Sequence, residues 1–335
     1  MNLFELIQKQ QSGIFPKDGI SFDDAFALTG TENKDLYFLF ALANSVREKY
    51  RGNKVNLCAL TNAKSGNCTE DCKFCSQSAH HNSKVEEYPL INEDEIVNQA
   101  RETINATKTN RFCIVISGKG VSEADLDVIC NALKRIKKEF PAIALDASLG
   151  FVSPEGIIKL KQAGLSRYNH NVETAESHFG KVCTTHKHSD RTNTIKAFKN
   201  AGIEACCGGI FGLGETSRQR IEMAFEIKAL DPHCIPLNFL NPIPGTALGN
   251  NKPLPPLELL KYVAIYRLIM PDKEIRVCGG RQTNLKNLQS MIFPAGADAI
   301  IIGNYLTTAG STPKDDHEMI KSMGLKIENN PNASE

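Results

Sequence analysis

The amino-acid sequence predicts an α/β fold, namely a (β/α)8 barrel of the TIM type with an N-terminal helical extension. Eight short apolar runs, rich in β-branched residues, alternate with helical stretches along the 335 residues. This alternation indicates parallel strands joined by helical crossovers, and eight such units fit a closed barrel better than an open sheet. No Gly-x-Gly-x-x-Gly motif follows the first run, which argues against a dinucleotide-binding fold.

The eight apolar runs are expected to form the barrel strands in chain order. They are KVNLCAL (54–60), RFCIVISG (111–118), AIALDASLG (142–150), SRYNHNV (166–172), IEACCGGIFG (203–212), CIPLNFLN (234–241), EIRVCGG (274–280) and DAIIIGNYL (298–306). Amphipathic segments between them predict crossover helices at 93–107, 122–139, 154–163, 190–200, 215–229, 256–269 and 283–292. Several of these segments open with cap signals, namely Ser122, Ser153 before Pro154, and Glu215 with Thr216.

The remaining segments suggest three parts of the chain. Residues 1–50 are expected to form a helical extension, residues 51–312 the barrel, and residues 313–335 a C-terminal extension.

Composition narrows the class of protein. The formal net charge is +1, and acidic and basic residues are mixed along the chain rather than grouped in runs of one sign. Such a chain offers no electrostatic footprint for nucleic acid or for an anionic membrane.

The cysteine content points to metal or redox chemistry. The N-terminus is too polar for a secretory signal, and no run of about 18 apolar residues occurs, so we expect a cytoplasmic protein. Thiols stay reduced in that compartment. The eleven cysteines therefore indicate metal or redox sites before disulfides.

Three of these cysteines lie close together in SGNCTEDCKFCSQSAHH, residues 65–81. Cys68, Cys72 and Cys75 occupy a loop that leaves the first strand at its C-terminal end, where barrel active sites form. Three thiolates at this spacing can hold three corners of a [4Fe–4S] cube and leave one iron open. A zinc site completed by His80 or His81 is the alternative.

The CxxxCxxC spacing, with Phe74 directly before the third cysteine, resembles the motif of the radical S-adenosylmethionine (SAM) superfamily. The resemblance implies that SAM binds the open iron and is cleaved by one electron to methionine and a 5′-deoxyadenosyl radical. From about residue 52 to 325, the chain is similar to the biotin synthase family. The matching segments, in order, are GNCTEDCKFCSQSAHH, RFCIV, YNHNVET, GGIFGLGET, PLNFLNPIPGT, IRVCGGR and GADAIIIGNYLTT.

The resemblance to biotin synthases implies a specific activity. Members of that family are sulfurtransferases that convert dethiobiotin to biotin, with an auxiliary iron–sulfur cluster, usually [2Fe–2S], as sulfur donor. The resemblance further implies a homodimer and an electron donor of the flavodoxin or ferredoxin type.

Strand alternation supports a polar barrel lumen independently of the family. Side chains at positions i and i+2 share one face of a strand. The polar pairs and triplets at this spacing are Arg111 with Cys113, Asn169 with Asn171 and Glu173, and Arg276 with Cys278. Buried polar groups on several strands at once need a ligand or cluster to satisfy them. Cys130 and Cys234, by contrast, are expected to have structural roles only.

The resemblance assigns roles to individual residues. Cys68, Cys72 and Cys75 match the ligands of the SAM cluster. Asn171, Glu173 and Arg191 match SAM contacts, with Arg111 near the adenosyl group. Asn169, Asn171 and Asn238 match the positions that hydrogen-bond the ureido ring of dethiobiotin, which suits an amide with both donor and acceptor. Cys113, Cys206 and Arg276 match three of the four auxiliary ligands.

The fourth auxiliary ligand is where this sequence departs from the family. Asp146 stands where the family pattern has a cysteine, while extra cysteines occur near the expected lumen. We hypothesise that the auxiliary cluster persists with altered ligands drawn from Cys113, Cys206, Cys278, Cys183, Asp146 and Arg276. The alternative is a related radical SAM isomerase, lyase or hydrogenase-cofactor maturase without sulfur insertion. An alternative of another class is a non-catalytic metal-binding protein on a barrel scaffold.

Overall fold

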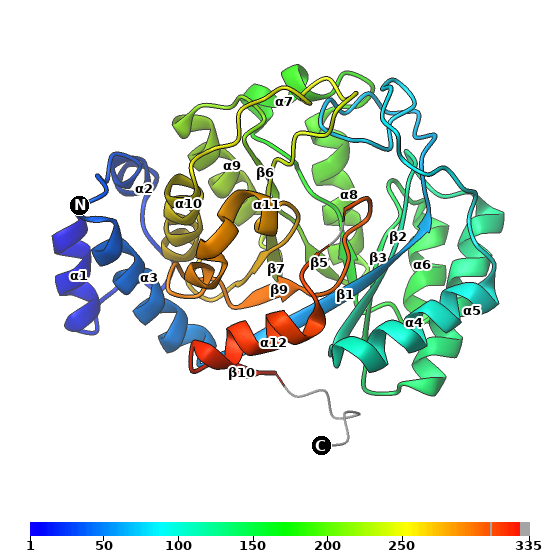
Figure 1. Ribbon diagram of the computed structural model, residues 1–335, viewed down its shortest axis with the longest axis horizontal. Helices are drawn as coiled ribbons and strands as arrows, with labels where there is room; N and C mark the ends of the chain where they lie inside the picture. The colour runs from blue at the N-terminus through cyan, green and yellow to red at the C-terminus, as the bar shows by residue number, and fades with distance from the viewer. Residues whose placement is uncertain (309, 329–335) are drawn as a thin grey trace.

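The chain forms a closed barrel of parallel strands in a computed structural model that describes residues 1–308 and 310–328 (Figure 1). The hydrogen-bonded order is β1-β2-β3-β4-β5-β7-β8-β9, and β9 pairs with β1 to close the barrel. Strand β6 follows β5 and pairs with β7, so β5 and β6 together fill one of the eight barrel positions. The predicted fold class is confirmed.

The strands coincide with the eight predicted runs. They are β1 (Lys54–Lys64), β2 (Arg111–Ile116), β3 (Ala144–Ser148), β4 (Arg167–Asn169), β5 (Glu204–Cys206), β6 (Gly209–Phe211), β7 (Cys234–Phe239), β8 (Glu274–Val277) and β9 (Ala299–Ile301). A short additional strand near the C-terminus, β10 (Lys326–Ile327), pairs with the start of β1 and was not expected.

Helices alternate with the strands and cover the outside of the barrel (Figure 1). They are α4 (Glu93–Thr107), α5 (Glu123–Glu139), α6 (Pro154–Gln162), α7 (Glu176–Val182), α8 (His188–Asn200), α9 (Ser217–Leu230), α10 (Pro256–Ile269), α11 (Arg281–Leu285) and the 3₁₀ helix η1 (Lys286–Ile292). Ser122, Ser153 and Thr216 cap α5, α6 and α9 as expected, because each side-chain oxygen accepts a backbone N–H of the first turn. None of the helices in the described residues is long and apolar enough to cross a membrane.

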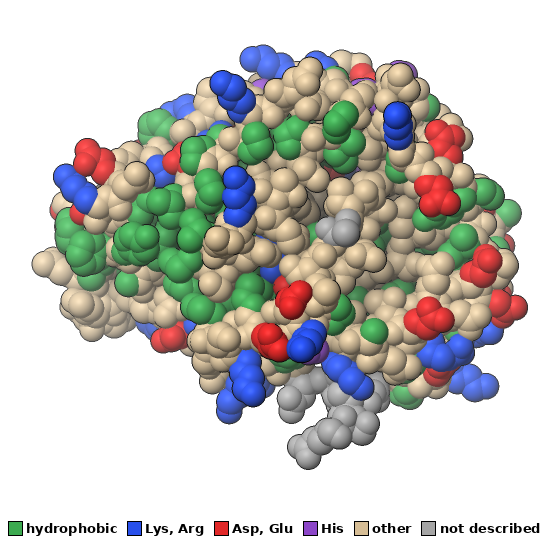
Figure 2. Space-filling model, viewed as in Figure 1, with side chains coloured by type: hydrophobic (Ala, Val, Ile, Leu, Met, Phe, Trp, Pro, Cys, Tyr) green, Lys and Arg blue, Asp and Glu red, His purple; other side chains and the backbone are tan. Residues whose placement is uncertain are grey.

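Further helices lie at the two ends of the chain. The N-terminal helices are α1 (Leu3–Gln11), α2 (Phe22–Leu28) and α3 (Leu36–Arg51), and α12 (Pro313–Ser322) precedes β10. Helix α10 lies between the barrel and the N-terminal helices, so every residue from Leu259 to Ile269 is buried. Figure 2 shows apolar side chains gathered over the N-terminal helices, where Phe4, Tyr37 and Phe38 are exposed. The division of the chain into three parts stays a prediction.

A buried charge network fixes the N-terminal helices to the barrel. Asp298, directly before β9, accepts from Arg267 of α10 at 2.5 Å and from Arg51 of α3 at 2.6 Å. Arg267 and Asp298 are almost completely buried. A buried pair of this kind need not stabilise more than an apolar pair, but removal of one partner leaves the other charge uncompensated.

We expect Asp298→Asn to lower the free energy of unfolding by about 3–5 kcal/mol, because Arg267 would lose its buried counter-charge. Urea unfolding measures this change. The matched control is Glu32→Gln, which removes an exposed pair with Lys34 and should cost less than about 1 kcal/mol. Equal effects of the two substitutions would contradict the role of the buried network.

Candidate active site

The loop between β1 and α4 gathers the three closely spaced cysteines. The N–H of Cys68 donates to the Gln77 carbonyl at 2.9 Å, and the Cys68 carbonyl accepts from Ala79 at 2.8 Å. The N–H of Cys75 donates to the Cys72 carbonyl at 2.9 Å. Gly66 enters the loop with a φ of 75° and approaches Glu87 so closely that a Cβ would lie 2.5 Å from the Glu87 Cγ, which accounts for glycine at that position.

These thiols open onto a cavity of about 200 Å³ at the C-terminal ends of β2, β3 and β4. Cys68, Cys72 and Cys75 line one side of it. The predicted site residues that line the same cavity are Asn169, Asn171, Glu173 and Arg191. The structure therefore brings the cysteine loop together with the residues expected to contact SAM.

The spread of the loop thiols fits a cluster better than a single metal ion. Around one zinc ion, thiolates lie about 3.8 Å apart, as follows from zinc–sulfur bonds of about 2.3 Å in a tetrahedron. Among the described residues, the only three-membered group of possible metal ligands within 4.8 Å of one another is Cys72, Cys183 and His186. His80 and His81 instead contact the carbonyls of Thr69 and Cys72, at 3.0 and 3.1 Å. The donor set of the loop thus fits an iron–sulfur cube, and the zinc alternative with these histidines gains no support.

Cys183 lies beside the SAM-cluster loop rather than in the barrel lumen. Its sulfur lies 3.3 Å from the Nδ1 atom of His186 and 3.2 Å from Asp71. A hydrogen bond from the Cys72 thiol lowers the pKa of Cys183 to about 4. The expectation that Cys183 is an auxiliary ligand is corrected here, because the end of α7 directs this residue toward Cys72.

Arg191, Glu173 and Asn171 form a connected polar group in the cavity. The Nη1 atom of Arg191 donates to the Asn171 carbonyl at 2.9 Å and to Glu173 at 3.2 Å, and its Nε donates to His186 at 2.9 Å. Burial raises the pKa of the Glu173 carboxyl, and Arg191 opposes that rise. Strand β4 ends at Asn169, so Asn171 and Glu173 reach the cavity through a turn with Glu173 at a φ of 68°, not through strand alternation.

Arg111 does not lie with these residues. It is the first residue of β2, at the opposite end of the strand from the cavity, and its Nη1 donates to Asp146 at 2.5 Å. A strand of six residues spans about 20 Å. The expectation that Arg111 lies near the adenosyl group is therefore corrected: its side chain is bound to the lower lumen by the buried Asp146 carboxylate.

The three asparagines expected to bind substrate lie at two neighbouring cavities. Asn238 lines a second, mainly apolar cavity of about 250 Å³ that shares Phe74 and Cys75 with the first. The Asn238 Oδ1 accepts from Gly279 at 2.9 Å, and the Asn171 Oδ1 accepts from Gly208 at 3.2 Å. Asn169 donates to the Cys113 sulfur at 3.2 Å, while its Oδ1 has no hydrogen-bond partner among the described residues. Asn169 thus keeps a free acceptor between the upper cavity and the lumen.

Below Asn169, the lumen contains a concentration of buried thiols. Cys113, Cys278 and Arg276 lie there, as predicted from strand phase, together with Cys206, which the family resemblance assigned to the lumen, and all four are buried. Cys234 also belongs to this group, because it is paired in register with Cys206 and the two side chains are hydrogen-bonded. We expected a purely structural role for Cys234. That expectation did not take into account that Cys234 and Asn238 are four residues apart on β7 and so share its inward face.

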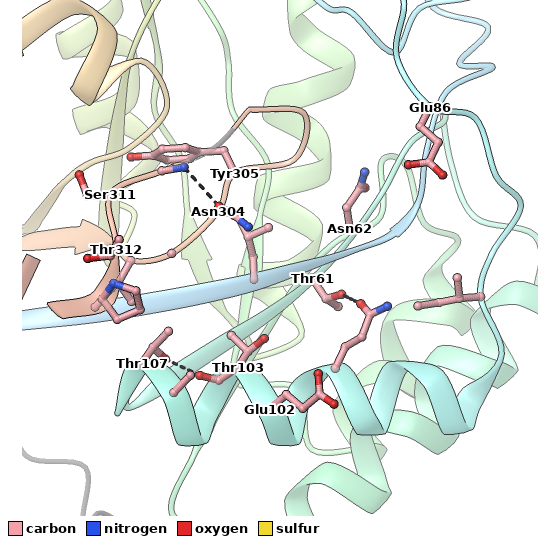
Figure 3. A pocket seen from close by; sticks show the side chains of 18 of the residues that line it. Thr61, Asn62, Glu86, Glu102, Thr103, Thr107, Asn304, Tyr305, Ser311 and Thr312 are labelled. Carbon is pink, nitrogen blue, oxygen red and sulfur yellow. Dashed lines mark hydrogen bonds between the residues drawn. The ribbon is translucent and has the colours of Figure 1, made fainter. Parts of the chain in front are cut away.

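A larger hollow of about 800 Å³ lies elsewhere on the molecule, between β1, α4 and residues 302–305 and 310–313 (Figure 3). Glu102, Thr103 and Thr107 of α4 face it on one side, and Asn304 and Thr312 lie across from them. None of the predicted site residues lines this hollow. Size alone therefore does not mark the active site in this barrel.

Comparisons with known proteins agree with this geometry. Residues 63–227 match the radical SAM superfamily, and residues 236–326 match the biotin and thiamin synthesis associated domain. The chain is 49% identical to a biotin synthase of Geobacter sulfurreducens over 91% of this chain and 92% of that protein. It is 47% identical to a biotin synthase of Pelobacter propionicus over 91% of this chain and 93% of that protein.

Solved structures with the same fold are more distant in sequence. Methylornithine synthase (PylB) superposes with a TM-score of 0.83 at 20% identity, covering 97% of this chain and 98% of that one. The hydrogenase maturase HydG superposes with a TM-score of 0.82 at 18% identity, covering 97% and 75%. These two likenesses show the barrel fold alone.

Proposed function

The chain belongs to the biotin synthase family of radical SAM enzymes, and from this premise we propose how its residues serve the conversion of dethiobiotin to biotin. It is a sulfurtransferase that uses SAM, a [4Fe–4S] cluster and an auxiliary iron–sulfur cluster. The alternatives without sulfur insertion, and the non-catalytic metal-binding protein, are not favoured by these relatives.

The cofactors supply the bond breaking and the protein supplies their positions. When bound, the SAM cluster and SAM would supply the one-electron chemistry that activates the C–H bonds of dethiobiotin, and the auxiliary cluster would supply the sulfur. Cys68, Cys72 and Cys75 would hold the SAM cluster, because the loop hydrogen bonds direct all three toward the same cavity. The cavity walls would exclude water from the reacting carbon.

Arg191, Glu173 and Asn171 would bind SAM beside the cluster. The Glu173 carboxylate and the Arg191 guanidinium offer opposite charges, which suits an amino acid with both an ammonium and a carboxylate group. Their mutual ion pair at 3.2 Å holds both side chains in the cavity before SAM arrives. Asn171 is fixed from the other side by Gly208, so little conformational entropy would be lost on binding.

Asn169 carries the substrate proposal most directly. It lines the cavity of the loop cysteines and also contacts Cys113 of the lumen, so it lies at the junction of the two proposed cluster sites. Its unpartnered Oδ1 is a suitable acceptor for a ureido N–H of dethiobiotin. Asn238 would bind the same ring from β7, and the apolar cavity around it, with Ile210 and Leu240, would take the aliphatic chain.

The electron donor and the oligomeric state are also proposed from membership of the family. We infer a small electron donor of the flavodoxin or ferredoxin type and a homodimeric assembly.

We expect Asn171→Ala to lower turnover by about a hundredfold, because small displacements of bound reactants are costly when two reacting centres must be aligned. Absorption spectroscopy should still show an intact SAM cluster, since Asn171 is not a thiolate ligand. Biotin formation under anaerobic conditions measures the effect. The matched control is Asn98→Ala on the exposed face of α4, which should leave turnover unchanged. Wild-type turnover in the Asn171 variant would exclude this residue from the site.

A further inference from the structure

The barrel lumen of this protein has an unusual lining. TIM barrels are filled mainly by branched apolar side chains. Here the inward positions carry buried thiols and charged groups instead. The buried thiols are Cys58, Cys113, Cys206, Cys234 and Cys278.

Asp146, which occupies the position of a family ligand, already has a partner. Its Oδ1 accepts from Arg111 at 2.5 Å, its Oδ2 has no hydrogen-bond partner among the described residues, and the Asp146 side chain is completely buried. Iron bound to either oxygen would draw negative charge away from the buried guanidinium of Arg111, whose other carboxylate neighbours are Glu204 at 3.6 Å and Glu274. Weakening the counter-charge of a buried guanidinium is costly, which argues against Asp146 as a metal ligand.

Two cysteines that carry no assigned role lie among the expected ligands. Cys58 of β1 packs against Cys113 of β2 in one buried cluster. The side chains of Cys234 on β7 and Cys206 on β5 are hydrogen-bonded, and Cys278, directly after β8, interacts electrostatically with both Cys234 and Cys58. The five thiols are therefore linked by neighbouring contacts in the lumen, with Arg276 interacting with Cys58, Cys206 and Cys234.

Unpartnered donors in the lumen fit an anionic group. The buried guanidinium groups of Arg111, Arg167 and Arg276 face the buried carboxylates of Asp146 and Glu274 and the partly exposed carboxylate of Glu204. The Nε atoms of Arg111 and Arg276 have no hydrogen-bond partner among the described residues. Buried donors without partners are costly unless a ligand accepts from them. A cluster ligated by thiolates is negatively charged and would supply that acceptor.

We infer that Cys58 and Cys234 are ligands of the auxiliary cluster together with Cys113, Cys206 and Cys278, and that Asp146 is not a ligand. The inference rests on the proposed function, because it concerns the sulfur-donating cluster of that reaction. Arg276 serves as the charge partner in the middle of the thiol group. The thiols of Cys58 on β1 and Cys234 on β7 take the place of the cysteine that the family has on β3.

The test uses the full chain with Cys68, Cys72 and Cys75 replaced by alanine, so that bound iron reports the auxiliary site alone. Cys58→Ala and Cys234→Ala are added separately, with Cys130→Ala on α5 as the matched control. Iron and acid-labile sulfide per chain are counted after anaerobic reconstitution, and circular dichroism checks the fold. If an alanine variant loses the native spectrum, Cys58→Ser or Cys234→Ser replaces it, because serine nearly keeps the volume but lacks the sulfur.

We expect Cys58→Ala and Cys234→Ala each to lower the retained iron at least about twofold, and Cys130→Ala to leave it unchanged. Asp146→Asn should also keep its iron, because the amide still accepts from Arg111. Full iron in both the Cys58 and Cys234 variants would overturn the inference, and iron lost only from the Asp146 variant would restore the carboxylate as a ligand. A parent chain without iron would overturn the auxiliary cluster itself, and with it the proposed sulfur insertion.

Discussion

Cys72→Ala is expected to abolish SAM cleavage, with deoxyadenosine formation at least about a thousandfold below that of the unmodified chain, a loss of about 4 kcal/mol in barrier terms. Cys72 is the middle ligand of the loop, and its backbone carbonyl also accepts the Cys75 N–H. Without its thiolate, the cube would keep two protein ligands instead of three and could not hold the open iron in the cavity. Deoxyadenosine is measured by mass spectrometry in an anaerobic assay with SAM and reductant.

A fourth thiol near the loop, that of Cys183, provides a second variant for this experiment. Cys183 lies within 4.8 Å of Cys72, so it is the thiol best placed to substitute for a lost loop ligand. We expect Cys183→Ala to keep the SAM cluster, because the three loop cysteines remain. The control Cys130→Ala, far along the chain on α5, should also keep deoxyadenosine formation. If the cluster were lost in the Cys183 variant and retained in the Cys72 variant, Cys183 and not Cys72 would be the cluster ligand.

Cys206→Ala is expected to separate the two halves of the reaction. Cys206 is paired in register with Asn169 and lies in the thiol group of the lumen, below the SAM cavity. Its loss should lower biotin formation at least about a thousandfold, because the sulfur donor would lose a ligand. Deoxyadenosine formation should stay within about threefold of the parent, since the SAM site is intact. Both products are measured in one assay.

Cys207→Ala provides the matched control for this substitution. Cys207 is the next residue, but it faces the apolar core outside the barrel sheet. Removing its thiol should lower stability by an amount typical of a small buried side chain, about 1 kcal/mol, and leave the ratio of biotin to deoxyadenosine unchanged. The same loss of biotin in both variants would mean that the effect comes from damage to the core and not from the lumen.

The barrel could be predicted from the sequence because its signals are local. Runs of β-branched residues predict the positions of the strands. The cap residues Ser122, Ser153 and Thr216 predict where three helices begin. Helix α7 was missed because its seven residues have no side-chain cap and too little length for a helical period. Strand β10 was missed because two residues carry no alternation, and its pairing with Lys54 and Val55 depends on the tertiary fold.

The site was predictable where one segment or one strand determines it. The cysteine loop follows from spacing, and the inward phase of Arg276 and Cys278 follows from alternation along β8 and the residue after it. Cys183 and Arg111 were placed wrongly because their neighbours come from distant parts of the chain, the Cys72 loop and Asp146 respectively. The sequence pattern predicts which face of a strand a side chain occupies. It does not predict how far along the barrel axis the interaction partner of that side chain lies.

The measurement that tests the central claim most directly is an anaerobic assay of the reconstituted chain with SAM, reductant and dethiobiotin. Deoxyadenosine and biotin are followed by mass spectrometry, together with iron and sulfide counts. The proposed arrangement predicts both products and more iron than the roughly four atoms that one cube holds. Deoxyadenosine without biotin, at about four irons per chain, would contradict sulfur insertion by the thiol-lined lumen.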